Sequence, residues 1–341
     1  MSDMIAKTLD GRDAIAYSQQ TPWHKKGQRL TPGADIEVWR REAGLDYTVL
    51  DSPVLFKHAE GSVNEAHIPF VGRKVLYCSD NLQPLGVMSD GYNVVQPGQV
   101  LDFYKTILER EGAVLQVAGA LDDRKRIWVL AKIGHGADIL DGAIVEPYLL
   151  GATSFDGSMS TTFKFTQIEV VCHNTLTASI GYQGEGQSEK GRDGATIRVP
   201  HSARFDPDEV RIDLGICFDE WEKLLHVSRK LARIPVDPKF AAFFLRSLLP
   251  TPVILNDQGK KVEGPVEASR AYSRILALFN GEAMGADQAA RDGTAYGLLG
   301  AVTEYVDHER GGDNTRLSSA WFGTGDGLKN KAFALLERVA A

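Results

Sequence analysis

The sequence predicts an α+β protein with a mainly antiparallel sheet, and two observations lead to this prediction. Apolar and polar residues alternate at every second position in several segments between residues 68 and 153, whereas an apolar residue at every third or fourth position is typical after residue 206. The links between the alternating segments are short, so consecutive strands are expected to pair. We therefore expect a core of hairpin, helix, three strands and helix, with helices covering the sheet and a helical C-terminal part.

Composition sets limits on size and partners. With 341 residues, 43% hydrophobic and 24% charged, the chain is long enough for one large domain or two ordinary ones. A net charge of −7 excludes a basic surface throughout, so a nucleic-acid partner needs a local basic groove. No apolar run approaches the roughly 20 residues that cross a bilayer. The first residues also lack an apolar signal core, so we expect a cytoplasmic protein without membrane contact.

Three regions are expected along the chain. Residues 1–50 form an N-terminal arm with a short helix at Ile36–Ala43, residues 51–205 an α+β core domain with a candidate nucleic-acid groove, and residues 206–341 a helical C-terminal region. Cys78, Cys172 and Cys217 lie far apart and form no CxxC pair, so they are expected to be reduced and structural.

The core is predicted from turn signals and periodicity. A hairpin should join Ile68–Cys78 to Pro84–Ser89 through a turn at Ser79–Asn81, with Gly91–Val95 as a short connection or edge strand. Pro97 opens a helix that Gly112 closes. Strands are expected at Ala113–Leu121 and Lys125–Ile133, and a third should end at Thr153.

The segment Leu149–Leu176 joins that third strand to a turn and a further element. Ser154, Asp156, Gly157 and Ser158 favour a turn. Thr166 and Glu169 then have the spacing of a capping box, and Ile168, Cys172, Leu176 and Ile180 recur every four residues. This pattern predicts a helix over Gln167–Ile180, although the valine pair also suits a strand.

The remainder is expected to be a polar loop followed by helices. Residues 181–205 are rich in glycine and charge, so they favour a mobile loop or long hairpin. Helices are predicted at Val210–Arg233, Lys239–Leu249, Pro265–Leu278, Thr294–His308 and Leu328–Val339.

Five motifs carry a resemblance to a known family. They are PWHKKG, SFDGSM, FTQIEVVCHNTL, GTAYGLLGAVTEYVDHER and SSAWFGTGDGLKNKA, which together span most of the chain. With these motifs the chain resembles the phage/plasmid-like proteins of domain-of-unknown-function family 932. The predicted element order is also similar to the core of the phage and plasmid single-strand annealing proteins of the RecT, Red-beta and ERF kinds. That second similarity is a topological analogy, which does not by itself assign a function.

Several chemistries can be weighed against the sequence. Neither GxxxxGK[ST] nor a GxGxxG after a predicted strand occurs, so nucleotide-driven motor chemistry is disfavoured and no cofactor is expected. Cys172 and His173 are neighbours on a predicted helix and would point about 100° apart, which disfavours a thiol protease. A metal-dependent nuclease could collect Asp90, Asp156, Glu169 and His173, but carboxylates at such spacings arise easily without a ligand role.

A nucleic-acid groove requires cations for phosphates and aromatic faces for bases. The candidates are Arg73, Lys74, Lys125, Arg126, Phe163, Lys164, Phe165, Arg192, Arg198 and Arg204. The leading hypothesis is a non-enzymatic protein that binds and anneals single-stranded DNA without ATP, as a homo-oligomeric ring or filament of a mobile element, with a possible exonuclease or replication partner. The alternatives are the metal-dependent nuclease, or another nucleic-acid enzyme, and a structural or regulatory interaction protein without nucleic-acid contact.

Overall fold

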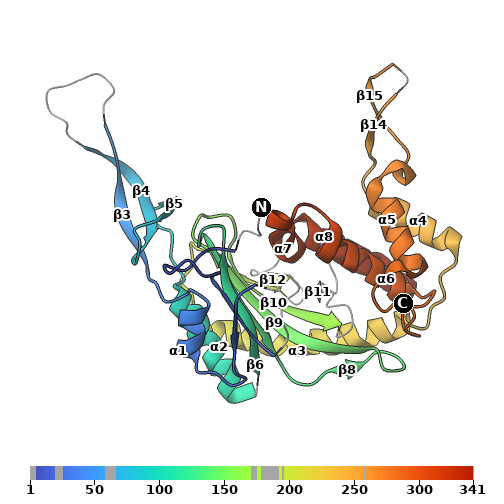
Figure 1. Ribbon diagram of the computed structural model, residues 1–341, viewed down its shortest axis with the longest axis horizontal. Helices are drawn as coiled ribbons and strands as arrows, with labels where there is room; N and C mark the ends of the chain where they lie inside the picture. The colour runs from blue at the N-terminus through green and yellow to red at the C-terminus, as the bar shows by residue number, and fades with distance from the viewer. Residues whose placement is uncertain are drawn as a thin grey trace.

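The computed structural model describes residues 5–19, 26–57, 67–111, 113–169, 175–177, 192–193, 196–256 and 258–340. Its centre is a long twisted sheet (Figure 1). The strand order in this sheet is β12-β13-β10-β9-β7-β6-β1-β2. The strands are β1 (Ile15–Ser18), β2 (Gln28–Leu30), β6 (Val114–Leu121), β7 (Arg126–Lys132), β9 (Ile144–Ser154), β10 (Thr161–Glu169), β12 (Arg192–Asp193) and β13 (Thr196–Val199). Two short strands extend it, because β8 (Ala137–Asp138) pairs with β9 and β11 (Thr175–Thr177) with β10. All strand pairs in this sheet are antiparallel except β1–β2. The mainly antiparallel pairing confirms the predicted fold class.

One face of the sheet packs against helices α2 (Pro97–Glu111) and α3 (Pro207–Leu231). Because side chains alternate along a strand, every second residue of β10 points to this face. Phe163 is fully buried there, with its ring centroid 4.6 Å from that of Phe103 on α2. Tyr104 of α2 is also buried, and its hydroxyl lies 3.1 Å from the carbonyl oxygens of Val129 and Leu149. Burial raises the pKa of Tyr104 well above its ordinary value.

The opposite face is apolar as well, and the C-terminal helices cover it. Helices α7 (Asp313–Phe322) and α8 (Thr324–Ala340) lie over this face in Figure 1. Trp128 and Leu150 are buried here, and the Trp128 ring meets Trp321 of α7 edge to face with 4.9 Å between centroids. The sheet is therefore an internal layer with helices on both sides, which positions its strand ends and turns at the surface.

Two hairpins project from this body at opposite ends of its long axis (Figure 1). The first belongs to a separate sheet of β3 (Val49–Phe56), β4 (Ile68–Cys78) and β5 (Pro84–Ser89), and it leaves Val71 90% and Phe70 52% exposed. The second joins β14 (Val253–Leu255) to β15 (Lys261–Glu263), with Val253 and Leu255 each 66% exposed. Exposed apolar side chains concentrated on projecting hairpins are typical of contact surfaces.

The remaining helices follow the predicted pattern closely. They are α1 (Ile36–Glu42), α4 (Pro238–Leu248), the 3-10 turn η2 (Val266–Ala268), α5 (Arg270–Ala277), the π-helical turn η3 (Leu278–Glu282), α6 (Ala295–Glu304) and the π-helical turn η4 (Tyr305–Glu309). Side-chain caps fix several starts: Asp237 accepts from Phe240 N, Ser269 from Tyr272 N and Thr294 from Gly297 N. None of the helices in the described part of the chain combines the length and apolarity that crossing a bilayer requires.

The predicted helix over Gln167–Ile180 is wrong. Residues 161–169 form β10, which pairs with β9, β13 and β11, and residues 175–177 form β11. The reason is a period of two that begins earlier: Phe163 and Phe165 point to one face, and Lys164 and Thr166 to the other. Strand pairing on both sides of β10 outweighs the capping-box spacing. Cys172 and His173 lie outside the described residues.

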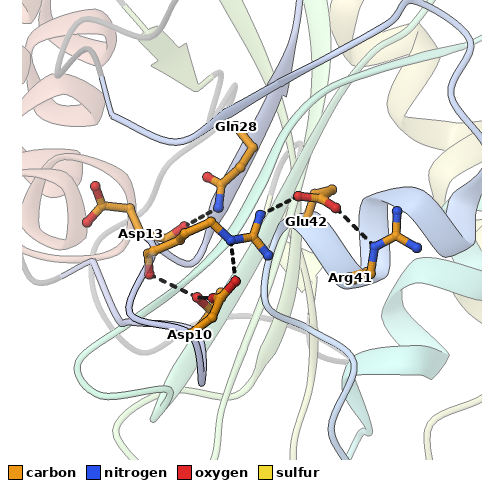
Figure 2. Close-up of polar contacts among 7 residues, drawn as sticks. Asp10, Asp13, Gln28, Arg41 and Glu42 are labelled. Atoms are coloured by element: carbon orange, nitrogen blue, oxygen red, sulfur yellow. Dashed lines mark hydrogen bonds and ion pairs between the residues drawn. The ribbon is translucent and has the colours of Figure 1, made fainter.

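The N-terminal arm contributes to the main sheet, because β1 pairs with β6 and β2 pairs in parallel with β1. Polar contacts tie this segment to α1, as Figure 2 shows. Arg12 donates to Asp10 and Glu42 over 2.6 and 2.5 Å, and Glu42 also accepts from Arg41 over 3.0 Å. The hydrogen bond from Arg12 is the main reason why the pKa of Glu42 lies below its ordinary value.

Candidate nucleic-acid interface

Three chain reversals meet at one end of the main sheet. They are the β4–β5 turn around Asp80, the β6–β7 turn at 122–125 and the β9–β10 turn at 155–160. We call these residues the turn surface. Arg124 Nη1 donates to Asp80 Oδ2 over 2.6 Å, and Gln83 Nε2 donates to Asp123 O over 3.1 Å. The β6–β7 turn also holds the β9–β10 turn, because Phe155 N donates to Lys125 O over 2.7 Å.

The β6–β7 turn has an uncommon backbone. Asp122, Asp123 and Arg124 have φ values of 52°, 52° and 67°. In this left-handed region each residue with a Cβ costs about 1–2 kcal/mol, so the surrounding contacts must hold the turn in place. The Arg124 guanidinium supplies several of them: it is 2% exposed, pairs with Asp80 and lies 4.9 Å from the centroid of the Tyr47 ring.

The β9–β10 turn is built by the SFDGSM motif, as the sequence predicts. Ser158 N donates to Asp156 Oδ1 over 3.0 Å, and Ser154 Oγ donates to Met159 O over 2.8 Å. Strand β5 passes so close that a Cβ at Gly86 would lie 2.9 Å from Asp156 Cα, a distance that real Cβ atoms do not show. Only glycine fits at position 86, and this close approach joins the small sheet to the turn.

His201 fastens the loop after β13 to the same turn. Its Nδ1 lies 3.0 Å from Asn93 O and its Nε2 lies 3.1 Å from Met159 O, while the Tyr92 ring stacks on it with 4.2 Å between centroids. Both partners are carbonyl oxygens, which only accept, so a neutral ring donates one of these bonds and an imidazolium both. Burial nevertheless lowers the pKa of His201 below 6.5, because it outweighs the two backbone contacts.

The pKa of one carboxyl group within the turn surface, that of Asp122, is raised. Arg126 bridges the turns, since its Nε donates to Ser158 Oγ over 2.9 Å and its Nη1 lies 3.1 Å from Asp122 Oδ2. Burial raises the pKa of Asp122, Arg126 opposes that rise, and the nearby carboxylate of Asp156 adds to it. Within the described residues, Asp122 Oδ1 is buried without a hydrogen-bond partner.

Several of the sequence-predicted cations gather at or beside the turn surface. Lys125 belongs to it, Arg126 follows directly and contacts Ser158 in it, and Arg204 follows His201 in the loop attached to it. Lys74 lies opposite Met88 of β5. Met88 is close to the β9–β10 turn, because its sulfur would be 3.2 Å from a Cβ on Gly157. Lys74 Nζ forms an ion pair with Asp51 over 3.1 Å. Arg73 is exposed on β4, directly opposite Ser89.

Three other candidates require correction. Lys164, Phe163 and Phe165 are 2%, 0% and 4% exposed, so they lie inside the protein. Lys164 Nζ points to the C-terminal helices, where it donates to Trp321 O over 2.8 Å and to Asp326 Oδ2 over 2.5 Å. The phenylalanines belong to the core beneath α2 and α3. Neither the ammonium nor the rings are available to a strand at the surface.

The last two cations lie on the far edge of the sheet. Arg198 on β13 is exposed, opposite Thr162 of β10. Its charge adds to the burial that lowers the pKa of Lys164. The backbone of Arg192 belongs to β12, and its side chain lies outside the described residues.

Sequence reasoning missed the buried ion pairs beneath α7 and α8. Besides Lys164–Asp326, Lys329 Nζ lies 2.7 Å from Asp307 Oδ1, and both side chains are at most 7% exposed. Lys164 and Asp326 are 162 residues apart. A local pattern cannot reveal such a pair, although the closely spaced Asp326 and Lys329 after the aromatic pair Trp321 and Phe322 are a usable signal.

The metal hypothesis finds no assembled site in the described residues. No group of three or more histidine, cysteine, aspartate or glutamate side chains that could hold a metal ion occurs in the part of the chain that the structure describes. Asp90 and Asp156 are within that part, whereas the Glu169 side chain and His173 are outside it.

The fold and the turn surface define an α+β protein whose antiparallel sheet is enclosed by helices and whose turns carry a mixed, cation-containing surface. The chain belongs to the family described as Domain of unknown function (DUF932), which matches residues 84–330 and confirms the resemblance drawn from the motifs. No curated protein and no solved structure matches the chain. The similarity to the single-strand annealing proteins therefore stays a prediction.

Proposed function

We propose that the protein binds single-stranded DNA in the cytoplasm through the turn surface and anneals complementary strands as a homo-oligomer, without ATP or a cofactor. The observation that carries this proposal concerns the interactions and the location of three cationic side chains. Within the described residues, the side chains of Arg73, Lys125 and Arg204 have no hydrogen-bond or ion-pair partner, and they lie at or beside the turn surface. Cations without such a partner in the described part of the chain, held beside turns that hydrogen bonds join, are suited to phosphates.

The mechanism needs only contacts with the phosphate backbone of the DNA strand. Phosphate contacts fix the position of a strand but carry no sequence information, so the bases stay available for a second strand. Because Phe163 and Phe165 lie in the core, neither ring of β10 can stack a base at the turn surface. A strand held by its phosphates alone suits annealing better than a strand whose bases are stacked on the protein.

Assembly is the second part of the proposal. The turn surface is short, so annealing along useful lengths requires neighbouring subunits. The two projecting hairpins are different in sequence and lie at opposite ends of the long axis (Figure 1). A contact between unlike surfaces generates a ring or a filament, because each copy leaves its other end available.

The decisive experiment mixes the protein with labelled single and double strands, with and without magnesium, and then follows the pairing of complementary strands by fluorescence quenching. We expect binding to the single strand and faster pairing, with no magnesium requirement. Cleavage in magnesium would contradict the proposal and favour the nuclease alternative. Absence of both binding and cleavage would contradict it in favour of an interaction protein.

A further inference from the structure

A pocket of about 390 Å³ lies where the start of α8 meets the ends of α4 and η4. Its lining consists of Leu249, Pro250, Ala271, Tyr305, Arg310, Thr324, Gly327, Leu328 and Lys331. A volume of this order is within the range of small-molecule sites. The pocket shares no residue with the turn surface, so it is a separate feature of the protein.

The charge of the lining is entirely positive, although the protein is acidic overall. Arg310 Nη1 is buried and, within the described residues, has no hydrogen-bond partner. A buried donor of a charged group is more costly to leave unsatisfied than a donor of a neutral group, so an acceptor that reaches the guanidinium of Arg310 is favoured. Among the lining residues there is no carboxylate to supply one.

Lys331 provides a second cation in the lining of the pocket. Its Nζ donates to Leu248 O over 2.8 Å. An ammonium group has three N–H donors, so the recorded contact uses one of them. Tyr305 and Thr324 add hydroxyl groups to the lining, whereas Leu249, Ala271 and Leu328 make the rest of it apolar.

We propose that this pocket binds a phosphate monoester with an apolar or aromatic organic part. A guanidinium presents a planar fork that matches two phosphate oxygens, and an ammonium acts as a compact charge beside it. Two cations also match the charge of a phosphate monoester at neutral pH, which is close to −2. The apolar lining would then cover the organic part. A mononucleotide has both elements.

The test is calorimetric titration of the full chain with 5′-AMP, in parallel with adenosine and inorganic phosphate. We expect 5′-AMP to bind, phosphate to compete with it, and adenosine to bind at least tenfold more weakly, since it lacks the charged group. Arg310→Gln and Lys331→Gln should each weaken 5′-AMP binding about tenfold or more, in line with the loss of one charged hydrogen bond. Lys239→Gln, which removes an exposed cation of α4 outside the pocket, is the matched control.

Three outcomes would overturn the proposal: no saturable binding of 5′-AMP, equal affinity for adenosine, or unchanged affinity in both pocket variants. If Arg310→Gln fails to fold, Arg310→Lys keeps the charge without the fork, and Lys331→Gln changes a side chain at the surface. Single-stranded DNA binding should be unaltered in Lys331→Gln. Failure of the pocket and failure of the proposed DNA function are therefore distinguishable.

Discussion

Lys164 Nζ on β10 lies 2.5 Å from Asp326 Oδ2 on α8, and this contact joins the sheet to the C-terminal helices. Both side chains are at most 10% exposed. Burial lowers the pKa of Lys164, and Asp326 opposes that effect by favouring the charged form. The pair thus places two charges in the interior, and removal of either partner would leave the other charge buried without compensation.

Lys164→Met should reduce the free energy of unfolding by about 3–5 kcal/mol, because Asp326 would remain buried without its partner. Lys74→Met is the matched control, since its partner Asp51 is 54% exposed and such pairs contribute at most about 1 kcal/mol. Urea unfolding of both variants measures the difference. Equal losses would contradict the structural role assigned to Lys164.

Acidification should destabilise the protein through His201. Its native pKa is lowered by burial, so the unfolded chain binds the proton more readily. The contribution of neutral His201 to the free energy of unfolding is complete above the pKa of the unfolded chain, about 6.5. It is lost as the pH falls through that value towards the native pKa. Denaturation curves across this window should show a shallower pH dependence for His201→Gln. The same pH dependence in the wild type and in His201→Gln would contradict this role.

Cys78 should resist alkylation in the folded protein. It is fully buried, and mainly for that reason its pKa is raised to about 11, which leaves very little thiolate near pH 8. Treatment with iodoacetamide followed by site-resolved mass spectrometry measures the modification of this residue alone. We expect modification only after denaturant is added. Rapid labelling of the native protein would show that the site opens readily.

The salt dependence of DNA affinity should separate surface cations from buried ones. Arg204→Ala and Lys125→Ala should each lower the magnitude of the slope of log affinity against log salt by about 0.7, which is the increment for one phosphate contact on a single strand. Lys164→Met should leave that slope unchanged, because its ammonium is buried against α8. A slope unaffected by either surface variant would remove the turn surface from consideration.

Charge placed on the first projecting hairpin should disrupt assembly. Val71 is 90% exposed, so Val71→Asp should cost little stability while it weakens an apolar contact between copies. Ile212→Asp, at a position 68% exposed on α3, is the control for a charge added elsewhere. Mass photometry should show smaller particles for the first variant only. A wild-type protein that stays monomeric with and without DNA would refute the assembly proposal.

The sequence predicts most of this fold because its periodic segments are long and their turns are well marked. The hairpin of β4 and β5, helix α2 and strands β6, β7 and β9 all lie close to their expected bounds. Strand β3 and helix α7 are not among the predicted elements. The error at residues 167–180 arose where a capping signal and a strand period overlap, and only the pairing partners decide between them.

Less of the candidate site could be predicted. Composition indicates which residues are cations, but their exposure depends on contacts between distant segments. Lys164 looks like a surface lysine until α8 is placed over β10, and Arg124 is buried by a turn whose backbone no local pattern reveals. Arg310 and Lys331 line the same pocket only because the end of η4 and the start of α8 converge on it.

The order of strands in the main sheet bears on which segment can fold as an independent unit. The family match covers residues 84–330, whereas β1, β2, β3 and β4 precede residue 84 and the last turns of α8 follow residue 330. A fragment cut to those limits would leave the edge of β6 unpaired and would separate β5 from β4. Unpaired edges promote aggregation. The stretch by which the family is recognised is therefore shorter than the stretch that must be expressed together to obtain a folded protein.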